Sequence, residues 1–510
     1  MRKRNVLLAA LVVFLALASV ADASKSSITV ALPEDPLTMD PHVTSSTIGW
    51  MVWRWSYDSL VASETRTGKI IPWLAEKWKK TGPLQYKFWL RRGVKFADGT
   101  PFTAAAVKYS IERVFDPALK GRQQGYWSGF DRLEILDDYT FIWHLKFPDN
   151  GLLQRLDRYL LIISPKTKEL PKEAFARATF GSGPYVLKSW TKGVKMIFEA
   201  NPDWWGNKLF PQRPKTVVLR SIKDSTTRVK ALIVGEVDVV MRVGGHEISE
   251  IKRNPDTDVG VVPGVRIFYL SFANRFGGPF ADRNIRLAVN HAIDVEGIAR
   301  TIVGGLAIPI GQFYHPWAYS GHNPKKTWYG YDLAKARAFM KESSHPNGFK
   351  VTLIATHGTN WFDKAACEAI AGMLQKIMID TTCQAVPFPM YRKLVTAYQT
   401  ERKDPAMFFR GWGNYADTPN VWRGTSSCKG IWSVSCFKDL DEWNEKSAAI
   451  DDPREQQAAF EKFTDTMKER AALRVFFQLV DAWGYRKGLE FVPRPDETFY
   501  VWEARTTEKP

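Results

Sequence analysis

The sequence predicts an α/β fold with more than one domain. Strand patterns and helix patterns alternate along the whole chain, without an internal repeat or a low-complexity segment. The 510 residues, of which 45% are hydrophobic and 25% charged, are enough for two or three globular cores.

Residues 1–23 read as a secretory signal peptide, with a basic head at 2–4, an apolar run at 6–20 and a small-x-small cleavage site before Ser24. The alternative is a membrane anchor, but the apolar run is short for a bilayer span of about 20 residues. A lipid tether requires a cysteine at the cleavage site, and the first cysteine is Cys367. We therefore expect a soluble exported protein, which in bacteria means a periplasmic one.

The elements expected in the first half of the chain follow from hydrophobic periodicity and turn residues. Strands are expected at residues 26–32, 85–90, 140–147 and 236–240, with a hairpin at 185–190 and 194–200. Helices are expected after Thr103, which can cap the N-terminus, and at 225–234, where Ser225 or Thr226 can do so.

The second half continues the alternation. Strands are expected at 265–273, 349–356 and 473–480, and helices at 284–293, 295–303, 331–343, 367–378 and 454–471. A domain boundary is expected near 260–268, with the last segment returning to the first domain.

Four cysteines, Cys367, Cys383, Cys428 and Cys436, lie in the C-terminal third. An even number in an oxidising compartment predicts disulfides, and Cys367–Cys383 with Cys428–Cys436 is the simplest of three connectivities. Zinc binding is the alternative, but no CxxC spacing supports it.

The precursor carries a formal charge of +17, and cleavage of the signal peptide leaves 68 basic and 53 acidic residues, or +15. Such a surplus could serve nucleic acid, an anionic surface or an acidic ligand. The basic residues are scattered, however, and no cluster reaches five in a row. A basic secreted surface is therefore favoured over nucleic-acid binding.

Sequence motifs of catalysis, metal binding and cofactor binding are missing. Residues 246–250, HEISE, begin like HExxH but lack the second histidine. Residues 181–184, GSGP, lack the third glycine of a dinucleotide loop. Neither a G-x-S-x-G elbow nor a Walker A sequence occurs. We expect no enzyme activity, no metal and no cofactor.

One stretch at 408–420, FFRGWGNYADTPN, crowds aromatic rings, an arginine and an aspartate into a segment that reads as a loop. It contains no serine, cysteine or histidine to act as a nucleophile. Large amphipathic rings line ligand clefts as well as cores, and composition alone does not separate the two uses.

Several segments, in order, resemble the bacterial extracellular solute-binding proteins of family 5, the oligopeptide-, dipeptide- and nickel-binding components of ABC importers. The first are ALPEDPLTMDPH (31–42), YDSLVASETRTGKIIPWLAEKWKK (57–80) and KFWLRRGVKFADGTPFTAAAVKYSIERVFDP (87–117). FGSGPYVLKSWTKGVKMIFEANPDWWGN (180–207) resembles the family's GTGPY…NPDYWG block. STTRVKALIVGEVDVV (225–240) and PFADRNIRLAVNHAIDVEGIARTIVGG (279–305) continue the match over nearly the whole mature chain.

The resemblance implies a periplasmic-binding-protein-like fold (cluster C) of two lobes joined by two crossovers, with the ligand enclosed by hinge closure. Lobe I would comprise residues 24–55, 180–267 and 476–510, with an extra subdomain at 56–179, and lobe II residues 268–475. The closed protein would dock on the permease of an ABC importer at the inner membrane. We expect a monomer with no nucleic-acid partner.

The same resemblance places the stretch at 408–420 in the cleft. Peptide-binding relatives carry a segment like GWGADYPDP, whose Trp lines the cleft and whose Asp, three residues later, pairs with the ligand's α-ammonium. Trp412 matches the Trp, Asn414 or Tyr415 stands at the Asp position, and Asp417 matches a later turn residue. Because a buried ammonium without a carboxylate costs several kcal/mol, we expect a ligand other than an ordinary free-amino peptide: blocked, sugar-linked or anionic.

Weaker candidates for ligand contact are Thr44, Ser45 and Ser46 after the first strand, Trp361 after the strand at 349–356, Trp127 in the subdomain, and Arg410. Each has a structural alternative. Residues 44–46 could be a polar loop, Trp127 is more often a core residue, and an internal ion pair is slightly favoured for Arg410 over a ligand carboxylate.

The function implied by the resemblance is that of a periplasmic receptor for a peptide or peptide-like solute. One alternative is a receptor for a non-peptide ligand, such as a sugar conjugate, an opine-like compound or a metal chelate. A remoter one is a secreted carbohydrate-active hydrolase, which requires two carboxylates about 5–10 Å apart at its cleft.

Overall fold

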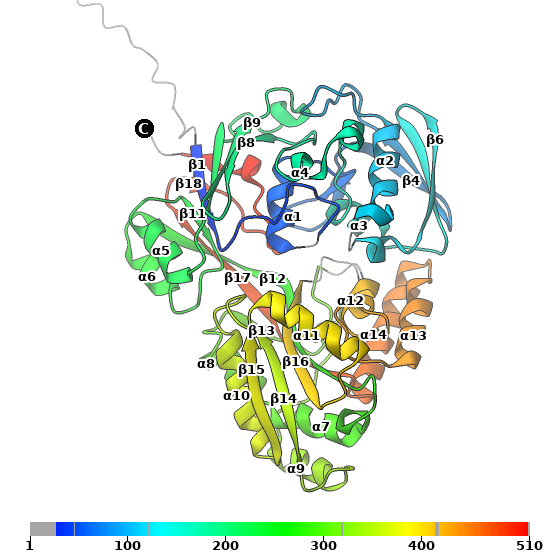
Figure 1. Cartoon of the computed structure of the whole chain (residues 1–510), viewed down its shortest axis with the longest axis vertical. Helices are drawn as coiled ribbons and strands as arrows, with labels where there is room; N and C mark the ends of the chain where they lie inside the picture. Colours follow the sequence, from blue (N-terminus) through cyan, green and yellow to red (C-terminus); the bar gives the residue numbers. More distant parts are fainter. Residues whose placement is uncertain (1–26, 45, 120–122, 318–319, 414–417, 508–510) are drawn as a thin grey trace, which may run out of the picture.

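Two bodies make up the computed structural model, which describes residues 27–44, 46–119, 123–317, 320–413 and 418–507. Figure 1 shows them one above the other, joined by β12 (Thr257–Phe272) and β17 (Leu473–Arg486). We call the upper body, which contains the first strand, lobe I and the lower body lobe II. In the described ranges, no helix is long and apolar enough to cross a membrane.

One large sheet runs through both lobes in the order β15-β14-β16-β12-β17-β11-β1-β10-β9-β8, and β13 pairs with β17. Its lobe I strands are β1 (Ser27–Leu32), β8 (Tyr185–Thr191), β9 (Lys195–Ala200), β10 (Thr216–Ser221) and β11 (Val239–Met241). Its lobe II strands are β13 (Ala307–Pro309), β14 (Phe349–Thr356), β15 (Ile379–Val386) and β16 (Ala406–Gly413).

A second, four-stranded sheet forms the outer part of lobe I, in the order β4-β5-β7-β6. Its strands are β4 (Ala75–Gly82), β5 (Gln85–Leu90), β6 (Phe130–Asp137) and β7 (Thr140–Leu145). With it lie the hairpin β2 (Val61–Ser63) and β3 (Ile70–Pro72) and the helices α2 (Ala104–Val114), α3 (Leu152–Arg158) and α4 (Lys172–Phe175). All of these elements fall within residues 56–179, the expected subdomain.

Helices cover the sheets of both lobes (Figure 1). In lobe I these are α1 (Thr47–Arg54), α5 (Ser225–Ile233) and α6 (Ile248–Arg253). In lobe II they are α7 (Arg283–Ala292), α8 (Val295–Thr301), α9 (Leu333–Lys341), α10 (Asp363–Gln375), α11 (Phe388–Thr400), α12 (Thr418–Thr425), α13 (Lys438–Ala448) and α14 (Pro453–Glu469). The lobe boundaries predicted at 268 and 475 lie inside β12 and β17, so the division there stays a prediction.

Most expected elements occur near their predicted positions, but three details were wrong. The stretch at 408–413 is not a loop: it belongs to strand β16. The cap of α5 is Asp224, whose Oδ1 accepts from the Thr227 amide at 2.8 Å, and neither Ser225 nor Thr226. Thr103 precedes α2 without a side-chain cap bond.

Both crossing strands are also longer than predicted, 16 residues in β12 and 14 in β17. Pro263 and Gly264 hide the first half of β12 from pattern recognition, because proline and glycine normally mark strand ends. They are tolerated because the register between β12 and β17 shifts between Pro263 and Ile267, where the ladder is irregular.

The two disulfides follow the predicted nearest-neighbour connectivity. Cys367–Cys383 joins α10 to β15, and Cys428–Cys436 closes a loop after α12. Both lie in lobe II and connect segments that are close in sequence.

The subdomain is attached to the rest of lobe I by a buried carboxylate. Asp58 accepts hydrogen bonds from the indole nitrogens of Trp73 at 2.7 Å and Trp205 at 3.0 Å, and from the Ser182 hydroxyl at 3.0 Å. Burial raises the pKa of Asp58 to about 6, although the hydrogen bonds from these three donors lower it.

A second attachment is His42, which is fully buried after β1 and hydrogen-bonds the Leu161 carbonyl through Nε2 at 2.9 Å. Burial, followed by the nearby charge of Arg113, lowers the pKa of His42 to about 4. The folded protein therefore holds this ring neutral at a pH where the unfolded chain protonates it.

We predict that His42 makes the protein acid-sensitive. The unfolded chain binds this proton near pH 6.5 and the folded protein only near pH 4, so the contribution of His42 to the free energy of unfolding is present above pH 6.5 and is lost as the pH falls to 4. The loss amounts to about 3 kcal/mol. Urea unfolding at pH 7 and pH 4.5 should show a smaller pH dependence for His42→Gln, whose amide can still donate to Leu161. Equal pH dependence in the two proteins would contradict the assignment.

Candidate functional site

The carboxyl ends of three parallel strands of lobe II lie at the junction with lobe I. β14 runs parallel to both β15 and β16, so the loops that follow them gather at one edge of the sheet. α/β proteins bind ligands at this kind of edge. Arg242, which follows β11 of lobe I, donates from Nη1 to the carbonyl of Thr359 at 3.2 Å, in the loop after β14. This edge therefore faces lobe I.

Arg266 on β12 connects three separate segments behind that edge. Its Nε and Nη2 each donate to the Glu497 carboxylate at 2.6 Å, and Nη2 also reaches Thr47 Oγ1 at 3.3 Å. Nη1 donates to the carbonyl of Gly411 in β16 at 3.4 Å. The start of α1, the C-terminal segment and the candidate strand of lobe II thus share one guanidinium.

The carboxylates at this junction carry opposite pKa shifts. Burial opposes ionisation of Glu497, but Arg266 and then Arg242 outweigh it and lower the pKa of Glu497. Burial, and then the charge of Glu497, raise the pKa of Asp481 on β17 well above its usual value. A side chain at Gly264 would lie 2.4 Å from Asp481 Oδ2, so only glycine fits beside it.

A cavity of about 30 Å³ remains between the lobes, room for about one water molecule. Ser63, Asp157 and Arg158 line it from lobe I and Trp317 from lobe II, with Val265 at the crossing strand. The Trp317 ring packs directly on Gly68, where an added Cβ would approach it to 2.8 Å. The lobes are in contact here, so the structure is a closed one.

Another contact closes the outer rim. Asn150 of lobe I donates through Nδ2 to the carbonyls of Ile450 at 3.0 Å and Asp451 at 3.2 Å, between α13 and α14 of lobe II. Lys80 pairs with the Asp451 carboxylate, and its ammonium also reaches Asn150 Oδ1 at 3.3 Å. In Figure 1 these elements of lobe II lie below α3.

Strand β16 carries two of the predicted site residues to the interlobe edge. Trp412 is half-buried, opposite Ile267 on β12, and its ring lies against Gly424 of α12. Arg410, two residues earlier on the same face, makes no ion pair with the described carboxylates, so the internal pair favoured from the sequence does not form there. Asn414, Tyr415 and Asp417 lie outside the described residues.

The segment after β1 is used partly for structure. Ser46 caps α1, its Oγ accepting from the Gly49 amide at 2.8 Å. The carbonyl of Thr44 accepts from Gln123 Nε2 at 2.9 Å. Both residues are half-buried, and Ser45 lies outside the described residues. Thr47, which sequence reasoning missed, is the member of this segment that contacts Arg266.

The two remaining tryptophan candidates differ in position. Trp361 is half-buried in the loop after β14, beside Thr359, at the interlobe edge. Trp127 is only 2% exposed and packs against Trp143, with ring centroids 5.7 Å apart. Trp127 therefore belongs to the core of the subdomain, and the prediction that it contacts the ligand is corrected.

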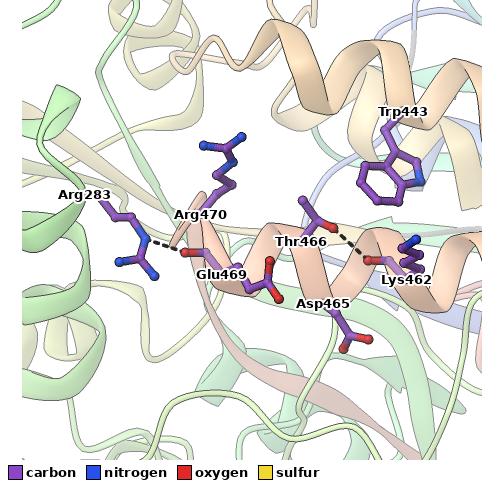
Figure 2. Close-up of a pocket in the computed structure, with 7 residues that line it drawn as sticks. All are labelled: Arg283, Trp443, Lys462, Asp465, Thr466, Glu469 and Arg470. Atoms are coloured by element: carbon purple, nitrogen blue, oxygen red, sulfur yellow. Dashed lines mark hydrogen bonds between the residues drawn. The ribbon is translucent and has the colours of Figure 1, made fainter.

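A larger recess of about 660 Å³ lies elsewhere on lobe II, between α13, α14 and the start of α7 (Figure 2). Two of its arginines are engaged: Arg283 donates to the Glu469 carbonyl at 2.6 Å, and Arg470 pairs with Asp439 at 2.8 Å. No lobe I residue lines it. Across the described ranges, no group of three or more His, Cys, Asp or Glu side chains could hold a metal ion.

Sequence reasoning missed the residues that join the lobes, namely Arg242, Arg266, Glu497, Asn150 and Trp317. Their partners are distant in the chain, 231 residues apart for Arg266 and Glu497. No local pattern marks such a pair. The aromatic and charged residues of the stretch at 408–420 were the sequence signal that did point to this region.

The chain is similar to known proteins both at the level of a family and at the level of individual relatives. The profile of the bacterial extracellular solute-binding proteins, family 5 Middle, matches residues 69–433. The chain is 25% identical over 483 residues to the "Glutathione-binding protein GsiB" of Shigella dysenteriae, covering 91% of this chain and 90% of that protein.

Solved structures agree with this result. The "ABC transporter-associated periplasmic binding protein DppA from Helicobacter pylori in complex with peptide STSA" is 25% identical, with a TM-score of 0.82 over 95% of this chain and 99% of that one. The "PBP AgaA in complex with agropinic acid" of A. tumefaciens R10 is 24% identical, with a TM-score of 0.81 over 94% and 99%. The periplasmic-binding-protein-like fold is thereby confirmed.

We predict that the rim contact slows opening of the lobes. Asn150→Ala removes two hydrogen bonds to backbone carbonyls and should speed dissociation of a bound ligand about tenfold. Asp451→Asn keeps the carbonyl and removes only a partly exposed ion pair, so its effect should stay below about fivefold. Stopped-flow fluorescence of the interlobe tryptophans measures both rates.

The order of the dissociation rates, with Asn150→Ala faster than Asp451→Asn and than the parent protein, is the critical result. Equal dissociation rates for Asn150→Ala and the parent protein, at unchanged thermal stability, would show that the rim does not hold the closed state.

Proposed function

The chain belongs to the bacterial extracellular solute-binding proteins, family 5, and on this premise we propose that it is the substrate receptor of an ABC importer, taking up a peptide or peptide-like ligand between its two lobes. Relatives named for peptides and for glutathione support this ligand class. The exported, periplasmic location and the delivery of ligand to a membrane permease are part of the same proposal.

The closed arrangement of the lobes is the observation that carries the proposal. β12 and β17 are the crossing strands. Three side-chain contacts hold the lobes together around the interlobe edge: Arg242 with Thr359, Trp317 with Gly68, and Asn150 with the carbonyls between α13 and α14. Most of these contacts consist of a few hydrogen bonds each. A ligand that bridges the lobes can add further hydrogen bonds between them. Hinge closure around a ligand follows from this construction.

At that edge, we assign Trp412 and Trp361 as apolar walls of the binding site from lobe II, with Thr44 and Ser46 at the lobe I side. Large rings contribute contact area with few rotatable bonds, which suits a binding wall. The proposed ligand is a peptide derivative without an ordinary free amino terminus, since Asn414 or Tyr415 occupies the position of the ammonium-binding Asp of peptide-binding relatives.

A hydrolase is the less supported alternative. It would require two available carboxylates across the cleft. Among the described residues near the junction, Glu497 is bound by Arg266 and Asp496 by Arg494 at 2.7 Å, and Asp157 pairs with Arg54. Carboxylates held in this way position other groups and are not free to attack. Of the four described carboxyls named at this junction, Asp481 alone pairs with no arginine, and it is buried beside Glu497. A hydrolase needs two available carboxyls, so the arrangement supports a binding protein rather than an enzyme.

Removal of the indole wall tests the site. Native mass spectrometry of protein purified from its own periplasm identifies the retained ligand, and Trp412→Ala should bind that ligand at least about tenfold more weakly by calorimetry. Trp89→Ala is the matched control, because Trp89 lies on the four-stranded sheet of the subdomain and its ring is covered by Lys77 and Lys87 of the same sheet. Equal losses in both variants would remove Trp412 from the site.

The ligand's amino terminus is tested separately. We expect N-acetylated di- to pentapeptides to bind at least about tenfold more tightly than the same peptides with a free ammonium, because Asn414 or Tyr415 replaces the carboxylate that would offset the buried charge. Tight binding of the unmodified peptides, undiminished at neutral pH, would refute this expectation and leave the receptor function in place.

A further inference from the structure

An arginine with no acceptor among the described residues lies just behind the proposed Trp412 wall. Arg410 sits on β16 directly opposite Tyr269 on β12, on the same face of the sheet as Trp412. Figure 1 shows α11 lying along the interlobe edge of lobe II, over this part of the sheet. α11 supplies Tyr391, which is fully buried.

Aromatic rings surround the guanidinium. Its central carbon lies 4.3 Å from the ring centroid of Trp432, 5.6 Å from that of Trp412 and 5.7 Å from that of Tyr391. Rings attract a cation through their π faces but accept no strong hydrogen bond. We call Arg410 and these three rings the arginine cage.

The hydrogen bonds of the cage are incomplete. Arg410 Nε and Nη1 are both buried, and neither has a hydrogen-bond partner among the described residues. The Tyr391 hydroxyl is buried without a partner as well. Because buried polar groups are normally paired, two such groups side by side indicate that an acceptor belongs between them.

Other interior arginines of the chain show what is missing. Arg54, Arg113 and Arg494 each pair with a carboxylate. Arg286 and Arg474 are buried too, and donate to backbone carbonyls. Arg410 has neither kind of acceptor in the described part of the chain, although two of its nitrogens are buried.

The cage lies near the interlobe edge. Arg410 is three residues from the end of β16, and Phe388, 40% exposed at the start of α11, lies 5.7 Å from Trp432 between ring centroids. A ligand group that passes Trp412 would therefore meet the guanidinium and the Tyr391 hydroxyl together.

We infer that the arginine cage is a subsite for a carboxylate of the ligand, so that the receptor takes an anionic compound whose acid group enters lobe II behind Trp412. The inference rests on the proposed function and deepens it. A carboxylate offers acceptors to the guanidinium and to the tyrosine hydroxyl at once, and charge-assisted bonds of this kind are the strong ones. Attached apolar atoms would lie between the indoles of Trp412 and Trp432.

Stability without any ligand gives the first test. Arg410→Met replaces an unpaired cation by an apolar chain of similar length, so the ligand-free variant should melt about 2 °C higher than the parent. Arg402→Met is the matched control: Arg402 also lies over a tyrosine of α11, at 4.7 Å from Tyr398, but is paired with Asp404 at 2.7 Å. The control should melt at or below the parent temperature. A lower melting point for Arg410→Met would overturn the inference, because the arginine would then be a structural one.

Small acids give the second test. Acetate, propionate and succinate at about 50 mM, at constant ionic strength, should raise the melting temperature of the parent and of Arg402→Met but not that of Arg410→Met. Tyr391→Phe should respond less than the parent. Acetamide, propionamide and succinamide should have no effect on any of them. An equal response of parent and Arg410→Met, or no response of the parent, would overturn the subsite.

The retained ligand separates this inference from the receptor function. A ligand with a carboxylate, bound at least about 30-fold more weakly by Arg410→Met than by Arg402→Met, is the expected result. A neutral retained ligand would refute the carboxylate subsite while leaving the receptor function intact. A protein that retains and binds no solute would instead count against the proposed function.

Discussion

The pairing of β12 with β17 is the constraint on which this structure depends. Their register runs from Thr257 opposite Arg486 to Ser271 opposite Leu473, so the two strands belong to both lobes at once. Between Pro263 and Tyr269 the register shifts, which interrupts the ladder where the lobes meet. A ribbon of two strands sets the path between the lobes, and side-chain contacts across the junction decide whether they are closed.

Arginines supply many of those contacts, and this explains how a basic protein uses its charge. Arg266 holds Glu497 and reaches both lobes, while Arg494 holds Asp496 in the C-terminal segment. In each case a buried carboxylate offsets the cation, and the pair fixes one geometry at little net gain in stability. Arg410 departs from this rule, because no described carboxylate pairs with it, and the inferred subsite rests on this difference.

Local patterns predicted the elements that local physics controls. The hairpin β8–β9, the strand β14 and the helix α14 occur where periodicity and turn residues placed them. The spacing of their apolar residues is a local property that the sequence shows directly. Both disulfides followed from spacing and compartment. The sequence of β16 predicts a loop, because its glycines and mixed polarity interrupt the alternation of apolar and polar residues that marks a strand. Its pairing with β12 and β14 is what makes it a strand.

For the candidate site, the sequence by itself indicated the family and predicted both Trp412 as a ligand wall and the loss of the carboxylate anchor, because ordered motifs and residue identities can be read along the chain. Tertiary structure alone decided that Trp127 is a core residue and that Arg410 has no carboxylate beside it in the described chain. It also decided that Arg266 joins segments 231 residues apart. The physical reason is the same in each case: burial and pairing depend on neighbours that are distant in sequence, and only the folded chain brings those neighbours together.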